Sequence, residues 1–265
     1  MKLNGQKTMK QRLNEGEFLF GTFYKFCNPQ LVEMLGYAGM DFVLIDGEHS
    51  DYSYRDFQDM IRVANGVGLN AVVRVPSSAE EHILHAADAG AQGVQIPSMD
   101  TVEEAFKATK HMRYYPIGDR GFGLTTRAAR YSFCDAQEYM DYVNKDLLSV
   151  VMVENLYMAD HVKELCEIPF IDVLFIGPGD LSQACGVPGQ TSHPKVLEVA
   201  KKICDGALAG GKKVGVYAAT LEDVDRYMSW GVQYIAHSAE LNMIAGKFKQ
   251  VVGDLHALRE KHSKK

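Results

Sequence analysis

Eight short runs of mostly apolar, β-branched and aromatic residues recur along the chain, and most are separated by stretches long enough for a helix. Within most runs the apolar residues are continuous rather than alternating with polar ones. This pattern is typical of parallel strands that are buried on both faces. We therefore expect eight parallel strands. They cover residues 18–26, 42–49, 71–76, 93–98, 148–155, 173–181, 213–219 and 234–240.

The stretches between these runs carry apolar residues at helical spacing. In residues 29–38, for example, Leu31, Met34, Leu35 and Ala38 fall on one face of a helix. The same spacing predicts further helices at residues 54–65, 79–89, 101–112, 194–209 and 221–230. Several of these stretches end in a glycine that suits the left-handed position after a helix: Gly39, Gly68, Gly90, Gly211 and Gly231.

Eight strand–helix units in 265 residues predict an α/β fold, a single (β/α)8 TIM barrel over residues 1–265. An open doubly wound sheet is the alternative, but no G-x-G-x-x-G motif follows the first strand. We expect a helix at about residues 4–15 and a short disordered C-terminal tail that contains Lys261. Residues 114–133 and 183–194 are expected to be long loops at the carboxyl ends of strands four and six, where barrel active sites lie.

Composition and charge narrow the class of partner. The chain has 34 acidic and 28 basic residues and a net charge of −6, without a basic stripe. This charge is a poor match for nucleic acid or an anionic membrane. The five cysteines are widely spaced without a C-x-x-C motif, which disfavours disulfides and a structural zinc site. The N-terminus is polar and no apolar run reaches membrane-spanning length, so we expect a cytoplasmic protein.

Two carboxylates interrupt the most apolar strands of the chain. Strand five ends with Glu154 in the sequence V-E-N, and Asp180 lies in the Gly-Pro-Gly-Asp sequence at the end of strand six. Carboxylates at the ends of adjacent strands repel each other unless a cation lies between them. Oxygen ligands favour Mg²⁺, Mn²⁺ or Co²⁺. The alternative is that each carboxylate caps a helix or pairs with an arginine.

Two further residues at strand ends could act on a substrate. Arg74 lies in the strand sequence A-V-V-R-V-P, and its guanidinium suits a carboxylate or an enolate. An ion pair with Asp46 or Glu48 is the alternative. His49 lies at the end of strand two, directly after Glu48, and could serve as a general base.

The motifs F-V-L-I-D-G-E-H, V-V-R-V-P, Y-P-I-G-D-R-G-F-G, V-E-N and F-I-G-P-G-D-L-S occur in this order between about residues 21 and 246. Together they resemble the HpcH/HpaI aldolase family. The resemblance implies a phosphoenolpyruvate/pyruvate-type barrel and a homohexamer built as a trimer of dimers. It also implies a class II aldolase that uses one divalent metal ion. Such an enzyme cleaves a 4-hydroxy-2-oxo acid to pyruvate and an aldehyde, often in aromatic-compound or sugar-acid catabolism.

The resemblance also implies roles for individual residues. His49 matches the base, and Arg74 matches the arginine that holds the pyruvate oxygens and stabilises the enolate. Glu154 and Asp180 match the metal ligands. The backbone of Gly179 and Asp180 matches the site of the pyruvate carboxylate. Asp88 matches an aspartate that supports a histidine; because it ends a helix that runs away from the catalytic face, we expect that histidine to belong to a neighbouring subunit.

Several positions depart from the family pattern. Met152 stands where a glutamine usually contacts pyruvate, and Tyr217 stands where a smaller aliphatic residue is usual. His237 and Ala239 replace a glycine and an aspartate in strand eight, and Ser50 replaces a glycine. These changes leave two alternatives open. One is a related metal-dependent lyase or decarboxylase, and the other is a barrel that binds a 2-oxo acid without turning it over.

Overall fold

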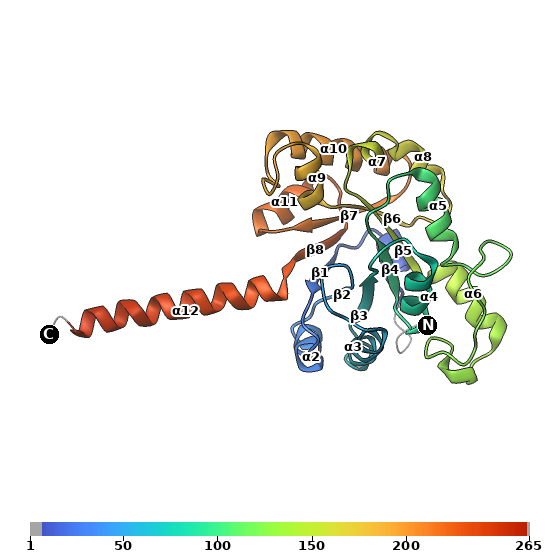
Figure 1. Cartoon of the computed structure of the whole chain (residues 1–265), viewed down its shortest axis with the longest axis horizontal. Helices are drawn as coiled ribbons and strands as arrows, with labels where there is room; N and C mark the ends of the chain where they lie inside the picture. Colours follow the sequence, from blue (N-terminus) through green and yellow to red (C-terminus); the bar gives the residue numbers. More distant parts are fainter. Residues whose placement is uncertain (1–6, 264–265) are drawn as a thin grey trace.

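Eight parallel strands form a closed barrel in the computed structural model, which describes residues 7–263 (Figure 1). Each strand pairs with the next along the chain, and β8 pairs with β1. The predicted fold class is therefore confirmed. The strands are β1 (Leu19–Tyr24), β2 (Phe42–Asp46), β3 (Asn70–Arg74), β4 (Gly93–Ile96), β5 (Leu148–Val153), β6 (Val173–Ile176), β7 (Lys213–Ala218) and β8 (Tyr234–Ala239).

Helices cover the outside of the barrel between successive strands (Figure 1). Six of them lie where the periodicity predicts helices: α2 (Pro29–Tyr37), α3 (Tyr54–Gly66), α4 (Glu80–Asp88), α5 (Val102–Lys110), α10 (Pro194–Ala209) and α11 (Leu221–Ser229). The five glycines predicted to end helices all have positive φ angles, between 76° and 92°. This confirms the boundary signal, because only glycine adopts that conformation without strain.

Large aromatic side chains fill the inside of the barrel beside glycines. Phe42 and Tyr234 stack with ring centroids 4.4 Å apart. A Cβ atom at Gly21 would lie 2.5 Å from the Phe42 ring, and one at Gly215 would lie 2.7 Å from Tyr234. Glycine at these two strand positions therefore makes room for the rings, and the lumen is a packed core rather than a pore.

Helix α1 (Met9–Asn14) closes the N-terminal end of the barrel. Its Met9 and Leu13 are 1% exposed and belong to the same apolar cluster as Leu19 and Phe42 of the lumen. The helix starts later than the predicted residue 4, because Thr8 caps it in a capping box with Gln11. Residues 4–6 of the predicted helix lie outside the described residues.

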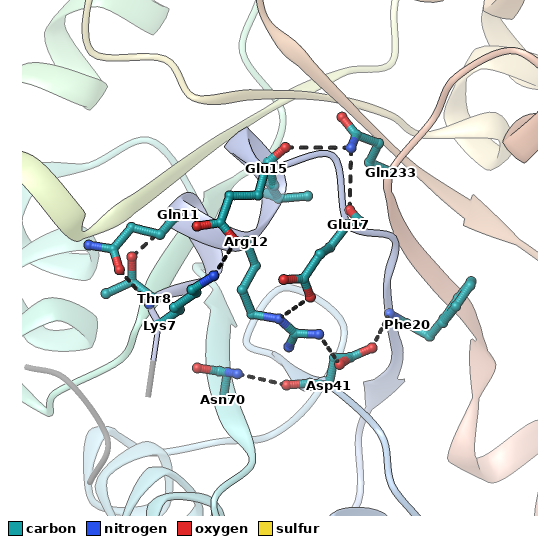
Figure 2. A network of polar contacts seen from close by, with 11 residues as sticks. Lys7, Thr8, Gln11, Arg12, Glu15, Glu17, Phe20, Asp41, Asn70 and Gln233 are labelled. Carbon is teal, nitrogen blue, oxygen red and sulfur yellow. Dashed lines mark hydrogen bonds and ion pairs between the residues drawn. The ribbon is translucent and has the colours of Figure 1, made fainter. Parts of the chain in front are cut away.

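A network of polar contacts fixes α1 to the first two strands (Figure 2). The Arg12 guanidinium donates to Glu17 and to Asp41, both at 2.7 Å. The second carboxylate oxygen of Asp41 accepts the backbone N–H of Phe20 at 2.9 Å. Gln233, just before β8, donates to the carbonyl of Glu17 at 3.3 Å. The N-terminal end of the barrel is thus held by contacts far apart in sequence, at the end opposite the predicted site.

Two predictions are wrong, one about the end of a strand and one about the position of a loop. Strand six does not run to residue 181, because β6 ends at Ile176 and α9 (Pro178–Ala184) begins two residues later. Pro178 has no N–H to donate and fits the first position of a helix. Residues 114–133 follow α5 rather than a strand. Arg113, just before them, donates to Asp172, which precedes β6, so this segment starts at the N-terminal end of the barrel.

Besides α9, four helices have no counterpart among the predicted elements. They are α6 (Ala136–Asp146), α7 (Leu156–Asp160), α8 (Val162–Glu167) and α12 (Glu240–Ser263). A single 3-10 turn, η1 (Arg130–Ser132), also interrupts the long segment before α6.

Helix α12 projects from the barrel rather than packing against it (Figure 1). Lys261 lies in this helix, so the short disordered tail expected there is not observed; Lys264 and Lys265 lie outside the described residues. The helix exposes a series of large apolar side chains: Leu241, Phe248, Val251, Val252, Leu255 and Leu258. None of the helices in residues 7–263 is both long and apolar enough to cross a membrane.

Candidate active site

Polar side chains converge at the carboxyl end of the barrel, and the pair of Arg74 and Asp46 lies at the centre. Strand β2 pairs Asp46 with Arg74 of β3, so both side chains point into the lumen. Arg74 donates from Nε and Nη2 to the two carboxylate oxygens of Asp46, both at 2.8 Å. Its Nη1 lies 2.7 Å from Glu48. The ion pair considered as an alternative for Arg74 is therefore present.

These ion pairs do not occupy all the N–H groups of the Arg74 guanidinium. Each Nη atom carries two hydrogens, so Arg74 keeps N–H groups for a substrate oxygen. Burial alone would raise the pKa of Asp46, but the hydrogen bonds and charge of Arg74 outweigh it and hold that pKa below its usual value. Asp46 therefore stays ionised and fixes the arginine in one orientation.

Asp46 also shapes the turn that carries His49. Its Oδ1 accepts the backbone N–H groups of Glu48 at 3.1 Å and of His49 at 3.3 Å. The His49 side chain is 58% exposed, and its Nε2 lies 3.8 Å from Glu48. The predicted base thus stands at the mouth of the barrel, where it can reach a bound substrate and exchange protons with water.

Among the carboxylates at this end of the barrel, Glu154 has the most strongly shifted pKa. It is 7% exposed; its Oε1 accepts the backbone N–H of Ser98 at 2.6 Å, while its Oε2 is buried without a hydrogen-bond partner. Burial raises its pKa to about 7; the hydrogen bond from Ser98 and the charge of Arg74 lower the pKa, whereas the nearby charges of Glu48 and Asp180 raise it. A buried, unpaired carboxylate oxygen is costly unless a cation or a proton satisfies it.

Asp180 lies in the first turn of α9, close enough for its charge to act on Glu154. Both Gly179 and Asp180 are exposed, and a Cβ atom at Gly179 would meet nothing within 4 Å. The backbone there is open to a ligand. Within residues 7–263, no group of three or more His, Cys, Asp or Glu side chains could hold a metal ion. The two carboxylates fit a divalent ion whose other ligands come from substrate and water.

The Phe23 ring contacts both Arg74 and Tyr217 on the floor of the site. The Arg74 guanidinium lies 4.8 Å from the centroid of the Phe23 ring, and the Tyr217 ring meets Phe23 edge-on at 5.7 Å. Met152 also points into the lumen and is 3% exposed. Its Cε lies near Gly177, since a Cβ atom there would be 3.3 Å away. Both departures from the family pattern, Met152 and Tyr217, therefore line this site.

The departures in strand eight have different positions. Tyr234 and Ala236 belong to the lumen cluster, so the alternation of a strand places His237 on the outer side. Its Nδ1 donates to the carbonyl of Ala218 at 3.0 Å. Ala239 returns to the lumen cluster and is 7% exposed. His237 is therefore better explained as a link between β8 and β7 than as a catalytic group.

Asp88 lies towards the N-terminal end of the barrel, whereas His49 lies at the carboxyl end. Asp88 is the last residue of α4, which runs from the end of β3 back towards the start of β4. Arg120, which is 5% exposed, donates to Asp88 at 2.6 Å. Asp88 also lines an open cavity of about 650 Å³ together with Tyr54, His85 and Arg127. It is thus held in a fixed position on a surface that a second copy of the chain could reach.

Two residues of the site, Ser98 and Lys25, have no role predicted from the sequence, and a third, Glu48, is predicted only as an alternative ion-pair partner of Arg74. Ser98 donates its backbone N–H to Glu154 and its hydroxyl to Glu48 at 2.9 Å, with a left-handed φ of 55°. Glu48 links Ser98 to Arg74. The Lys25 ammonium lies 3.2 Å from Asp46. Their positions at the ends of strands one, two and four are the only sequence signal that could have drawn attention to them.

Comparisons with known proteins identify the family of this chain. The model of the HpcH/HpaI aldolase/citrate lyase family matches residues 19–245. A hydroxypyruvate/pyruvate aldolase of Roseovarius nubinhibens is 31% identical over 245 residues, which are 92% of this chain and 95% of the relative. A 2-keto-3-deoxy-L-rhamnonate aldolase of Escherichia coli is 32% identical over 228 residues, 86% of this chain and 85% of the relative.

The fold agrees as well. A crystal structure of an HpcH/HpaI aldolase/citrate lyase family protein from Burkholderia cenocepacia superposes with a TM-score of 0.88 at 28% identity. The superposition covers 94% of this chain and 98% of that one. The chain therefore belongs to the HpcH/HpaI aldolase/citrate lyase family, and it is an aldolase.

Proposed function

We propose that this aldolase cleaves a 4-hydroxy-2-oxo acid to pyruvate and an aldehyde, with Glu154 and Asp180 as the ligands of one divalent ion, Mg²⁺, Mn²⁺ or Co²⁺. The observation that carries the proposal is Glu154 itself. Its Oε2 is buried and unpaired beside two further carboxylates, and Arg74 lies fixed in the same end of the barrel. This arrangement is unfavourable in the empty protein and becomes favourable when a cation and an anionic substrate bind together.

The chain's own residues can carry out the cleavage. His49 removes the proton of the 4-hydroxyl group, the C3–C4 bond breaks, and its electron pair forms the pyruvate enolate. Arg74 donates to the developing enolate oxygen, and the open backbone at Gly179 and Asp180 accommodates the carboxylate. A divalent ion between the carboxylates would supply positive charge next to the 2-oxo group. Protonation of C3 then yields pyruvate.

The remaining assignments concern binding of the two halves of the substrate. Met152 cannot donate to pyruvate as a glutamine would, so we assign this half to Arg74 and the α9 backbone. The Tyr217 side chain narrows the part of the site that binds the aldehyde half, and its hydroxyl group can form a hydrogen bond with that half. Neither departure removes a group that the cleavage itself requires.

We also propose that the chain works as a homo-oligomer, as a hexamer of the kind the resemblance implies, in the cytoplasm. Two features support assembly. Helix α12 leaves large apolar side chains in water, among them Phe248 at 67% exposure. Asp88 is held rigidly but lies away from the His49 of its own chain, as expected for a residue that supports the His49 of a second copy. The five cysteines are all free, as expected in a reducing compartment.

Release of pyruvate from a simple 4-hydroxy-2-oxo acid tests the proposal, with and without a chelator. We expect pyruvate only when a divalent ion is present, and we expect Glu154→Ala and Asp180→Ala to lose that activity while their thermal unfolding stays cooperative. Asp172→Ala is a control carboxylate at the opposite end of the barrel. Full activity of Asp180→Ala in the presence of chelator would refute the metal site. Release of CO₂ in place of an aldehyde would identify a decarboxylase instead.

A further inference from the structure

Lys25 stands at the mouth of the barrel, one residue beyond β1. Its ammonium lies 3.2 Å from Oδ2 of Asp46, and its side chain is 29% exposed. Asp46 already has both oxygens bound by Arg74 and two backbone N–H groups on Oδ1. Since an ammonium has three hydrogens, the contact with Asp46 leaves further N–H groups of Lys25 for a ligand.

The backbone of Lys25 is fixed by a buried carboxylate from the other end of the chain. Glu240, which is 4% exposed, accepts the N–H groups of Lys25 and of Phe26 on one oxygen, both at 2.7 Å. Glu240 is the first residue of α12, directly after β8. The strand end that carries Lys25 is therefore held in place rather than free to move, so its side chain projects from a defined point.

The position of Lys25 relates it to one half of the substrate. In the closed order of eight strands, β1 lies directly opposite β5, and Glu154 directly follows β5. Phe23, on the same face of β1 as Lys25, forms the floor between Arg74 and Tyr217. If pyruvate lies between Arg74, Glu154 and the α9 backbone, the rest of the substrate extends towards the wall that carries Lys25 and Tyr217.

We propose that Lys25 determines the aldehyde specificity of this enzyme by binding a carboxylate on the aldehyde half of the substrate. This inference rests on the proposed aldolase function and specifies its substrate class: a 4-hydroxy-2-oxo acid with a second acid group. A cation at this position attracts such a group by a charge-assisted hydrogen bond. It offers a neutral aldehyde nothing comparable, so the preference arises from charge and not from size.

The reverse reaction gives two probes that differ in charge but hardly in size. Pyruvate loses a proton from its methyl group, its C3 bonds to the aldehyde carbon, and the aldehyde oxygen takes up a proton. Glyoxylate is an aldehyde with a carboxylate, and glycolaldehyde is its neutral counterpart. We expect the metal-loaded wild type to prefer glyoxylate in kcat/KM. Raised ionic strength should weaken that preference, because salt screens a partly exposed charge.

Variants at two matched lysines test the role of this charge. Lys25→Met should lower the ratio of kcat/KM for glyoxylate over glycolaldehyde at least tenfold, whereas Lys25→Arg should keep most of it. Lys10→Met is the control: Lys10 also pairs with an aspartate, Asp172 at 2.7 Å, and its side chain is 27% exposed, but it lies at the other end of the barrel. We expect that variant to leave the ratio unchanged.

The outcomes separate this inference from the proposed function. Equal losses for both aldehydes in Lys25→Met would show that Lys25 only supports Asp46, and would overturn the specificity role. A wild type that prefers glycolaldehyde would overturn it as well. A wild type that adds pyruvate to neither aldehyde and releases none from a 4-hydroxy-2-oxo acid would refute the aldolase proposal, and the specificity role with it.

Discussion

Arg74 has two tasks that only a guanidinium can combine. It binds both oxygens of Asp46 in a two-pronged contact, and it must still present N–H groups to the enolate. A lysine keeps the charge but not the planar fork. We therefore expect Arg74→Lys to lower kcat by a factor on the order of 10²–10³, the usual cost of one lost oxyanion donor. Steady-state kinetics of pyruvate release measures this. A loss of only a few-fold would mean that Arg74 is a structural partner of Asp46.

Glu154 makes the stability of the metal-free protein depend on pH. Burial raises its pKa to about 7 in the folded state, above the ordinary value of 4.5 that it regains on unfolding. The folded state therefore holds the proton more tightly, and stability is lost as the pH rises from about 4.5 through 7. Glu154→Gln removes this loss. We expect the variant to be more stable than the wild type above pH 7 by roughly 2–3 kcal/mol, and the difference to shrink towards pH 5.

Denaturant unfolding in chelator at pH 5 and pH 8 checks this expectation. Addition of Mn²⁺ should then stabilise the wild type at pH 8 and leave Glu154→Gln almost unchanged, because ligand binding stabilises only the state that binds. Parallel pH profiles for the two proteins would contradict the buried, unpaired carboxylate.

Met152 is a milder departure, because it removes a donor and no charge. A neutral hydrogen bond contributes roughly 0.5–1.5 kcal/mol. Met152→Gln should therefore tighten pyruvate binding several-fold, as calorimetry on the metal-loaded protein would show. Tyr217→Leu is the comparison and should change which aldehydes are accepted. If Met152→Gln instead shifts aldehyde preference and leaves pyruvate affinity unchanged, the placement of these two side chains is wrong.

For single residues, the sequence predicts which side chains could take part in the reaction better than it predicts the contacts that those side chains form. Glu154 and Asp180 stand out because carboxylates interrupt apolar strands, and the structure places each near the other's charge. The bridging role of Ser98 depends on the meeting of three strand ends, which no local pattern encodes. For the same reason the buried amide of Gln95, whose side-chain atoms find no hydrogen-bond partner among the described residues, was visible only as a polar residue in a strand.

Among the elements, α1 has only six residues but buries the side chains of Met9 and Leu13. Leu13 is fully packed against the lumen cluster at the closed end of the barrel. Leu13→Ala should cost about 2–5 kcal/mol, the usual range for a buried leucine. Leu221→Ala, at a position 73% exposed, is the control and should change stability by less than about 0.5 kcal/mol. Thermal unfolding of both variants tests this prediction. Equal melting temperatures would show that α1 is only loosely packed against the barrel.

The strands and most helices can be predicted from the local pattern of apolar residues. The wrong predictions occur where that pattern competes with another signal. Mostly apolar, β-branched and aromatic runs identify all eight strands, and most of these runs are continuous because parallel strands are buried on both faces. Strand six is predicted to run too far, because the prediction continues through Gly177 to Leu181 although Pro178 begins α9. Short helices such as α7 and α8 bury few residues each and give no clear helical period.

For the whole molecule, closure of the barrel explains why the site could be expected where it lies. Parallel strands in a closed ring bring all eight carboxyl ends to one rim, so residues separated by more than a hundred positions, such as Asp46 and Glu154, share one small volume. The same closure separates function from stability. The Arg12 network and α1 hold the opposite rim, so variants there should change unfolding and leave the chemistry intact (Figure 2).

The projecting helix α12 is the part of the molecule that the barrel alone does not explain. It contacts the barrel chiefly near its start, at β1 and β8, and its apolar residues beyond Gly246 are exposed. Removal of residues 247–265 should therefore leave a folded barrel but a smaller assembly, as measured by light scattering after size-exclusion chromatography. Activity should fall with the assembly, because Asp88 would no longer reach a neighbouring His49.

The double variant Phe248→Glu and Leu255→Glu should dissociate the full-length chain in the same way, since it places charges in the apolar face. Gln250→Glu adds a charge on the opposite side of the helix and should have no effect on mass or activity. A full-length chain that is monomeric and active would contradict both the assembly and the role of Asp88 across subunits.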